Sequence, residues 1–273
     1  MQYYLFVVLL AFLAPSGLGL ENREETFAKK ISNQQTSAQD SILDPITFTI
    51  SAYPKQKELY TEILNLLDRK HYRKLDIDDK FSRDYLEAYL ELLDPQKSYF
   101  LQSDIEAFKK WENVLDDFLI DGNTDPGFIM YNRLRTRVDE RLRANIQLLK
   151  SEYKFDLTDD VFFNANADSR QWLISPQESN DLWNKRIKDS LIRLLLNDKD
   201  PTAARDLLIK RYKNQLKQLR QRDSEDVFQL YANAFAGLYD PHTAYYSPRT
   251  TENFQINMSL SLEGIGAELL NED

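Results

Sequence analysis

The sequence of 273 residues contains no cysteine, which excludes disulfides, thiol catalysis and cysteine-ligated zinc. It contains only two histidines, His71 and His242, and they lie far apart, so we expect neither a metal site nor a cofactor. Glycine is also scarce, because only Gly122 and Gly127 occur between residues 20 and 236. No glycine-rich phosphate loop and no Gly-x-Ser-x-Gly nucleophile elbow is present.

Basic residues are outnumbered, with 35 Lys and Arg against 44 Asp and Glu and a net charge of −9. An acidic chain without a basic stripe argues against nucleic acid as a partner, and we expect at most peripheral membrane contact. The apolar run from Tyr3 to Ala14 is too short to span a bilayer, which takes about 20 residues. We therefore predict a signal peptide over residues 1–20 and export of the protein, although no basic residue precedes the run. A buried or anchoring N-terminal helix is the alternative.

What the sequence does contain is apolar residues at helical spacing. These stripes cover residues 59–67, 81–92, 105–119, 131–149, 183–194, 204–219 and 227–238. Helix starts are expected at Ser103 with Glu106, at Ser175 with Glu178, at Asp200-Pro201 and at Ser247-Pro248. We predict a mainly α-helical domain over residues 51–252, after a linker or N-terminal extension at 21–50.

The spacing of apolar residues along the chain changes near residue 253. Phe254, Ile256 and Met258 alternate with polar residues in a pattern that continues to Leu262. Strict alternation is typical of a half-buried strand, so we predict a strand over 254–263 and a new domain over 253–273.

Two segments of the chain, 146 positions apart, carry the same residue types at the same spacing. Asp94, Pro95 and Tyr99 fall on Asp240, Pro241 and Tyr245, and Glu106 and Phe108 fall on Glu252 and Phe254. The residue before a proline disfavours helix, so each copy predicts a helix end, a turn and a new helix. We expect the aspartates to cap backbone N–H groups and the tyrosines to pack, with direct ligand contact as the alternative.

Other polar groups carry weaker signals. A catalytic histidine would need a nucleophile and an orienting acid, and the sequence identifies no nucleophile for His242. We interpret His242 as a hydrogen-bonded turn residue and His71 as solvated. In "LEGIGAEL", Gly264, Ile265, Gly266 and Ala267 can turn backbone N–H groups toward one point, which suits a peptide's terminal carboxylate. A simple β-turn or bulge is the alternative.

Three segments together resemble the tail-specific proteases, which are periplasmic C-terminal processing peptidases. They are "HYRKLDIDDKFSRDYLEAYLELLDPQKSYFLQSDIEAF" (71–108), "YDPHTAYYSPRTTENF" (239–254) and "MSLSLEGIGAEL" (258–269). The resemblance implies a multi-helix N-terminal domain followed by a PDZ domain, of which residues 253–273 would be the truncated start. It also implies that residues 264–267 receive the C-terminal tails of substrate proteins.

In this family a serine peptidase domain with a Ser nucleophile and a Lys base should follow, and no Ser or Lys here matches that pair. We therefore expect the N-terminal, substrate-handling part of a serine endopeptidase, inactive alone, with an envelope adaptor as a further partner. A stand-alone helical binding or scaffold protein of the envelope is the alternative, and an intact enzyme is a third.

Overall fold

The structure, a computed structural model, describes residues 42–151, 155–156, 162, 164, 170–197 and 199–259. The chain divides into two units, 1–44 and 45–273, and every described helix lies in the second. These helices are α2 (Pro54–Lys70), α3 (Asp79–Leu93), α4 (Gln102–Phe108), η1 (Lys109–Trp111), α5 (Leu115–Ile120), α6 (Asp125–Lys150), α7 (Pro176–Leu195), α8 (Pro201–Gln221), α9 (Ser224–Tyr239) and α10 (Pro248–Ser259). The prediction of a mainly helical chain is confirmed.

Most helix starts follow the sequence signals. Ser175 Oγ accepts the Glu178 N–H at 3.2 Å at the start of α7. Asp200 accepts the N–H groups of Thr202 and Ala203 at the start of α8. The start predicted at Ser103 is wrong, because α4 begins at Gln102 after the N-cap residue Leu101.

One predicted stripe, residues 105–119, does not form one helix. The helical path is interrupted at Val114, where φ is −139° and ψ is 4°. The chain then restarts as α5, which packs against α3 and α2. Leu115 and Leu119 of α5 are fully buried.

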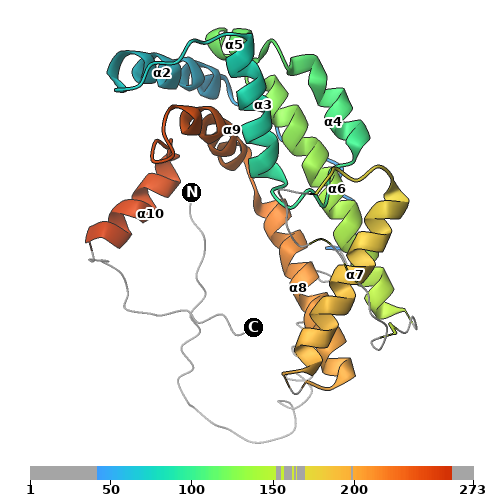
Figure 1. The fold of residues 1–273 in the computed structure, drawn as a ribbon. Helices are drawn as coiled ribbons and strands as arrows, with labels where there is room; N and C mark the ends of the chain where they lie inside the picture. Colours follow the sequence, from blue (N-terminus) through green and yellow to red (C-terminus); the bar gives the residue numbers. More distant parts are fainter. Residues whose placement is uncertain are drawn as a thin grey trace, which may run out of the picture. The chain divides into compact units, whose positions relative to one another are not determined.

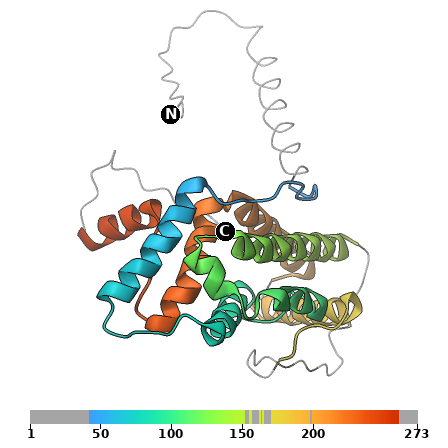
Figure 2. The ribbon, with the colours of Figure 1, turned by 90° about the horizontal axis from the view of Figure 1, so that it is seen from above.

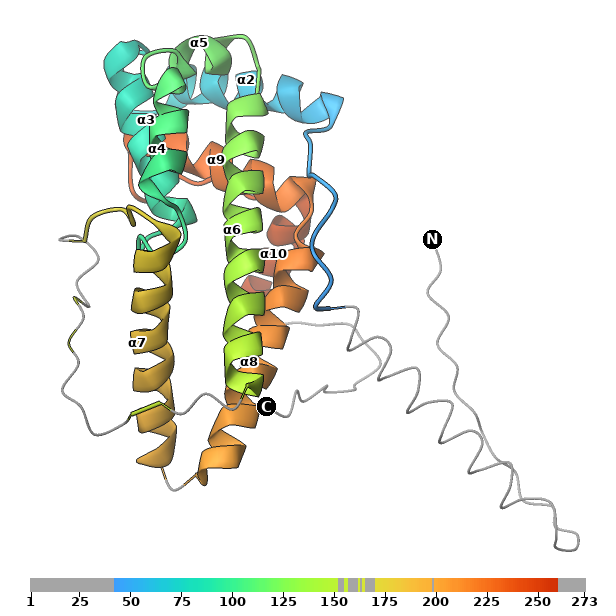
Figure 3. The ribbon, with the colours of Figure 1, turned by 90° about the vertical axis from the view of Figure 1, so that its right-hand side faces the viewer.

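The helices gather into two regions that share α6 (Figures 1 and 3). In the first region α2, α3, α5 and α9 pack around the N-terminal half of α6. In the second region α8 packs against α7 and along the C-terminal half of α6. Because α6 has 26 residues, its length of about 39 Å is enough to run through both regions.

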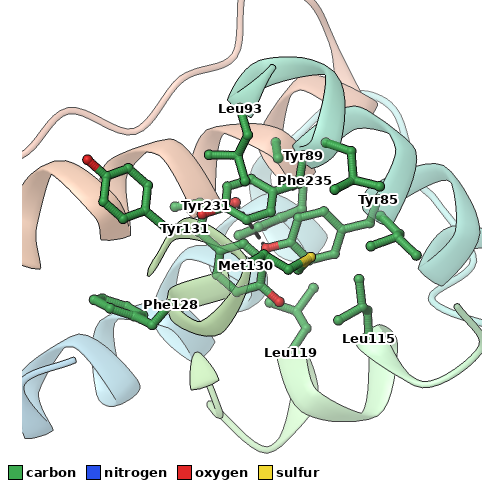
Figure 4. Close-up of a cluster of buried hydrophobic side chains, with 14 of the residues drawn as sticks. Tyr85, Tyr89, Leu93, Leu115, Leu119, Phe128, Met130, Tyr131, Tyr231 and Phe235 are labelled. Carbon is green, nitrogen blue, oxygen red and sulfur yellow. Dashed lines mark hydrogen bonds between the residues drawn. The ribbon is translucent and has the colours of Figure 1, made fainter. Parts of the chain in front are cut away.

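The centre of the first region is a cluster of buried tyrosines (Figure 4). The ring of Tyr231 on α9 lies 5.4 Å from that of Tyr60, 5.0 Å from that of Tyr85 and 4.8 Å from that of Tyr89, measured between ring centroids. The Tyr85 hydroxyl donates to the Tyr231 carbonyl at 2.9 Å, so the 2.7 Å bond between Tyr60 and Tyr85 must be donated by Tyr60. Burial raises the pKa of Tyr231 to about 12, so the cluster stays neutral.

The strand predicted over 254–263 is wrong for the residues that the structure describes. Helix α10 continues through Ser259, and residues 260–263 lie outside the described part of the chain. Alternation favours a strand only where a sheet buries one face, and here Phe254 and Met258, one helical turn apart, are both exposed. Ser247 Oγ also accepts the Thr250 N–H at 3.3 Å, which fixes the start of the helix.

Among the described helices, none is both long and apolar enough to cross a membrane.

Replacing Gly127 by Ala should destabilise the fold. A Cβ atom at Gly127 would lie 2.4 Å from Cγ of Tyr231, closer than real Cβ contacts, so α6 and α9 would have to separate. We expect the free energy of unfolding to fall by about 2 kcal/mol, as for other overpacked core sites. Urea denaturation followed by circular dichroism measures this change.

Gly237→Ala is the matched control, because a Cβ there meets no atom within 4 Å and the residue is also helical. It should leave the stability unchanged or raise it slightly. Equal effects of the two substitutions would contradict the role given to Gly127.

Candidate functional site

The two repeated segments form turns with the same helix boundaries. Helix α3 ends at Leu93 and α4 begins at Gln102, whereas α9 ends at Tyr239 and α10 begins at Pro248. Both pairs of boundaries differ by the 146 positions of the repeat (239 − 93 and 248 − 102). We call these turns the first corner (94–101) and the second corner (240–247).

Asp94 organises the first corner. Its carboxylate accepts the backbone N–H groups of Ser98 at 3.0 Å, Tyr99 at 2.8 Å and Phe100 at 3.0 Å. The side chain is 1% exposed, so these bonds replace the water that the carboxylate loses. The capping role expected for Asp94 is therefore what its geometry provides.

Asp240 occupies the same place in the second corner but is more accessible. Its Oδ1 accepts the His242 N–H at 2.8 Å, and its Oδ2 accepts the Tyr72 hydroxyl at 2.7 Å. The bond from Tyr72, followed by that from His242, lowers the pKa of Asp240. One carboxylate thus joins the corner to the segment after α2.

The tyrosines of both corners are half-buried and pack on aromatic neighbours. The Tyr99 ring lies 5.2 Å from the ring of Trp183, and the Tyr245 ring lies 5.3 Å from that of Phe228. Pro95 and Pro241 are exposed, and each lies two residues after the end of a helix. The corner residues therefore meet neighbouring helices and do not converge on one another.

The segment that follows α2 closes the second corner, and the sequence did not reveal this contact. His71 is half-buried, not solvated as we expected, because its Nε2 lies 3.1 Å from Oγ1 of Thr243. Arg73 Nη1 donates to the carbonyls of Leu238 and Tyr239 at 3.2 Å. These carbonyls end α9, where a cation is favourable. The partners are more than 160 residues apart, so no local pattern could identify them.

The helices that start after the two corners differ in the burial of their aromatic residues. Phe108 at the end of α4 is 3% exposed and stacks on Trp111, whereas its counterpart Phe254 on α10 is 48% exposed. Phe254 contacts only the similarly exposed ring of Tyr246 among the described aromatic pairs, with the centroids 5.7 Å apart. The second corner therefore ends in an aromatic surface that the described part of the chain does not cover.

A groove of about 610 Å³ lies beside this surface, between α10, the start of α2 and the start of α9. Figure 2 shows α2 and α9 side by side, with α10 at their edge. The apolar part of the groove wall consists of Tyr53, Leu59, Phe228, Tyr245, Tyr246 and Pro248. Lys55, Glu225 and Glu252 add charges of both signs, so the groove suits a polypeptide with apolar side chains better than a small anion.

Other candidate residues stand apart from this groove. Gly264, Ile265, Gly266 and Ala267 lie outside the described residues, so their carboxylate-binding role stays a prediction. Within the described ranges, no three His, Asp or Glu side chains gather as metal ligands would.

Known proteins resemble this chain over most of its length. A family model described as the tail-specific protease N-terminal domain matches residues 63–249. The chain is also 36% identical over 236 residues to a protein of Haemophilus influenzae named "Tail-specific protease". That match covers 85% of this chain and 33% of the relative, so the chain spans about a third of the relative's length.

The two corner aspartates should differ in their effect on stability. Asp94→Ala leaves three backbone N–H groups without their acceptor at a buried site, and we expect a loss of about 3 kcal/mol in the free energy of unfolding. Asp240→Ala, the matched substitution, should cost much less because water can reach the groups it frees. Chemical denaturation of the two variants measures the difference, and similar losses would contradict this account.

Removing the Tyr72 hydroxyl should raise the pKa of Asp240. In Tyr72→Phe the largest cause of the lowered pKa is gone, and the bond from the His242 N–H is the largest that remains. A lowered carboxyl pKa stabilises the fold above the unfolded-state pKa, and this stabilisation is lost as the pH falls through the folded-state pKa. The variant should therefore titrate Asp240 at higher pH, as measured by the ¹³C carboxyl shift in NMR. Tyr53→Phe, which removes a hydroxyl outside this pair, should leave the titration unchanged.

Proposed function

The chain belongs to the tail-specific protease family, and from that premise we propose that it is the N-terminal, substrate-handling part of a periplasmic serine endopeptidase. Such an enzyme recognises proteins by their C-termini and degrades them. The observation that carries the proposal is the match over 85% of this chain to 33% of a tail-specific protease. In this proposal the Ser nucleophile and the Lys base lie in the part of the protease that this chain does not cover.

The helical domain would hold a substrate while its tail is engaged elsewhere. The groove beside α10 supports this role, because it combines a wall of tyrosines with exposed aromatic rings at its edge. Exposed apolar surface of this kind binds segments that folded proteins bury and unfolded ones expose. Specificity for the tail would come from residues 264–267, whose N–H groups would receive the terminal carboxylate.

This chain should therefore bind a substrate without cleaving it. We expect the purified chain to bind an unfolded protein that ends in small apolar residues, and to leave it uncut, because no nucleophile with a positioned base is assigned here. Tyr246→Ser and Phe254→Ser should each weaken binding several-fold, as measured by fluorescence anisotropy. Leu196→Ser, an exposed apolar site at the end of α7, is the control and should bind as the unchanged chain does.

Two results would contradict the proposal. One is cleavage that co-purifies with the chain and persists through successive purification steps. The other is binding that the groove substitutions do not change. Genomic DNA downstream of codon 273 gives a separate test: PDZ and peptidase coding sequence, in frame or frameshifted, supports a protease part. Its absence would favour a stand-alone scaffold of the envelope instead.

A further inference from the structure

Residues 45–50, which we call the strap, run extended beside α6 before α2 begins (Figure 3). Asn132 on α6 binds both backbone groups of one strap residue. Its Oδ1 accepts the Ile50 N–H at 2.9 Å, and its Nδ2 donates to the Ile50 carbonyl at 2.7 Å. A side-chain amide thus pairs with the strap as a neighbouring β-strand would.

Two further α6 side chains continue this pairing. Arg135 Nη1 donates to the Phe48 carbonyl at 2.7 Å. Asp139 Oδ2 accepts the Ile46 N–H at 3.5 Å, a longer bond. The three contacts therefore fall on alternate residues of the strap.

The spacing of these contacts follows from the geometry of the two elements. Positions 132, 135 and 139 lie on one face of α6 and span about 10 Å at 1.5 Å per residue. Strap residues 50, 48 and 46 span about 13 Å at 3.3 Å per residue, in the opposite direction. Because the two lengths nearly match, one helix face can serve alternate peptide groups of an extended chain. We call Asn132, Arg135 and Asp139 the α6 track.

The track contacts the strap's backbone more than its side chains. Thr47 and Thr49 are exposed, and Phe48 is 57% exposed although its ring lies 4.1 Å from Cζ of Arg135. Of the strap residues only Ile50 is buried. Backbone groups are common to all polypeptides, so recognition of this kind tolerates many sequences.

The strap also leaves part of the track unused. Arg135 is 1% exposed, yet its Nε and Nη2 have no hydrogen-bond partner among the described residues. These two atoms form one edge of the guanidinium, the edge that binds two acceptor oxygens side by side. Burying such donors without acceptors is costly, so the strap does not complete the hydrogen bonding of the track.

We propose that the α6 track is a binding site for an extended segment of a substrate polypeptide, and that the chain's own strap occupies it as a displaceable competitor. The ligand class is a peptide of about five residues that presents backbone N–H and C=O groups at alternate positions, with a branched apolar residue at the place of Ile50. This site is separate from the groove beside α10. It needs neither a PDZ domain nor a catalytic domain, so its failure would leave the proposed function intact.

The strap has a strong advantage over a free peptide in occupying the track, because tethered segments reach effective concentrations on the order of millimolar. A free peptide should therefore bind weakly until the strap is loosened. Phe48→Ala loosens it by removing the ring over Arg135, while the track itself is unchanged. We expect a labelled peptide with the sequence of residues 43–53, LDPITFTISAY, to bind the full-length Phe48→Ala chain about fivefold tighter than the unchanged chain. Fluorescence anisotropy measures this ratio, and Thr47→Ala, an exposed strap substitution, should not change the affinity.

Modified peptides test the backbone contacts without altering the protein. N-methylation at the position of Ile50 removes the N–H that Asn132 accepts and should weaken binding to the Phe48→Ala chain about tenfold. N-methylation at the position of Thr49 is the matched control and should have a much smaller effect. Asn132→Leu in the same background should also weaken binding, with the fold checked by circular dichroism.

Three outcomes would overturn the proposal. They are equal binding of the peptide to the Phe48→Ala and unchanged chains, equal effects of the two N-methyl groups, and dimerisation of the Phe48→Ala chain in light scattering without peptide binding. The last result would assign the track to the strap of a second copy.

Discussion

The close approach of α6 and α9 at Gly127 and Tyr231 is the contact on which the rest of the helical domain depends. Only a residue without a Cβ lets the Tyr231 ring lie directly on the α6 backbone. In that position the ring reaches Tyr60 on α2 and both Tyr85 and Tyr89 on α3. Tyr89 also donates to the Gly127 carbonyl at 3.0 Å, so the glycine is held from two sides. Four helices are therefore positioned by one aromatic ring and the space beside one glycine.

Helix α6 transmits this constraint to the surface of the domain. Its N-terminal half belongs to the tyrosine core, and its C-terminal half packs against α8. Between them, Arg137 binds the buried carboxylate of Asp104 through Nε at 2.8 Å and Nη2 at 3.1 Å, which fixes α4 to α6. The polar face that meets the strap lies on the same helix. A helix that is rigid because its core contacts are tight can present side chains at fixed spacing to an extended chain.

The sequence predicted the helices better than their surroundings. Local signals decide where a helix starts, so Ser175 and Asp200 could be identified, and the repeated Asp-Pro marked both helix ends. Contacts between distant segments could not be predicted this way, as Arg73 on the end of α9 shows. Over residues 254–259, which the structure describes, the predicted strand was wrong because alternation describes a face that another element must bury, and a sequence does not say which element that is. The strap was assigned to a linker for the same reason: its bonds to α6 cross more than 80 residues.

The difference between the two corners indicates why one spacing occurs twice. In the first corner the carboxylate is buried and the aromatic residue of the next helix enters the core, so the turn and the helix after it are both part of the packed domain. In the second corner the same spacing fixes the turn, but Asp240 is partly accessible and Phe254 is exposed. The second corner is held by the Asp240 carboxylate and by the segment that follows α2, and none of these bonds involves Phe254. Phe254 is then available for contacts outside the helical domain, and the groove beside α10 lies where such contacts would be made.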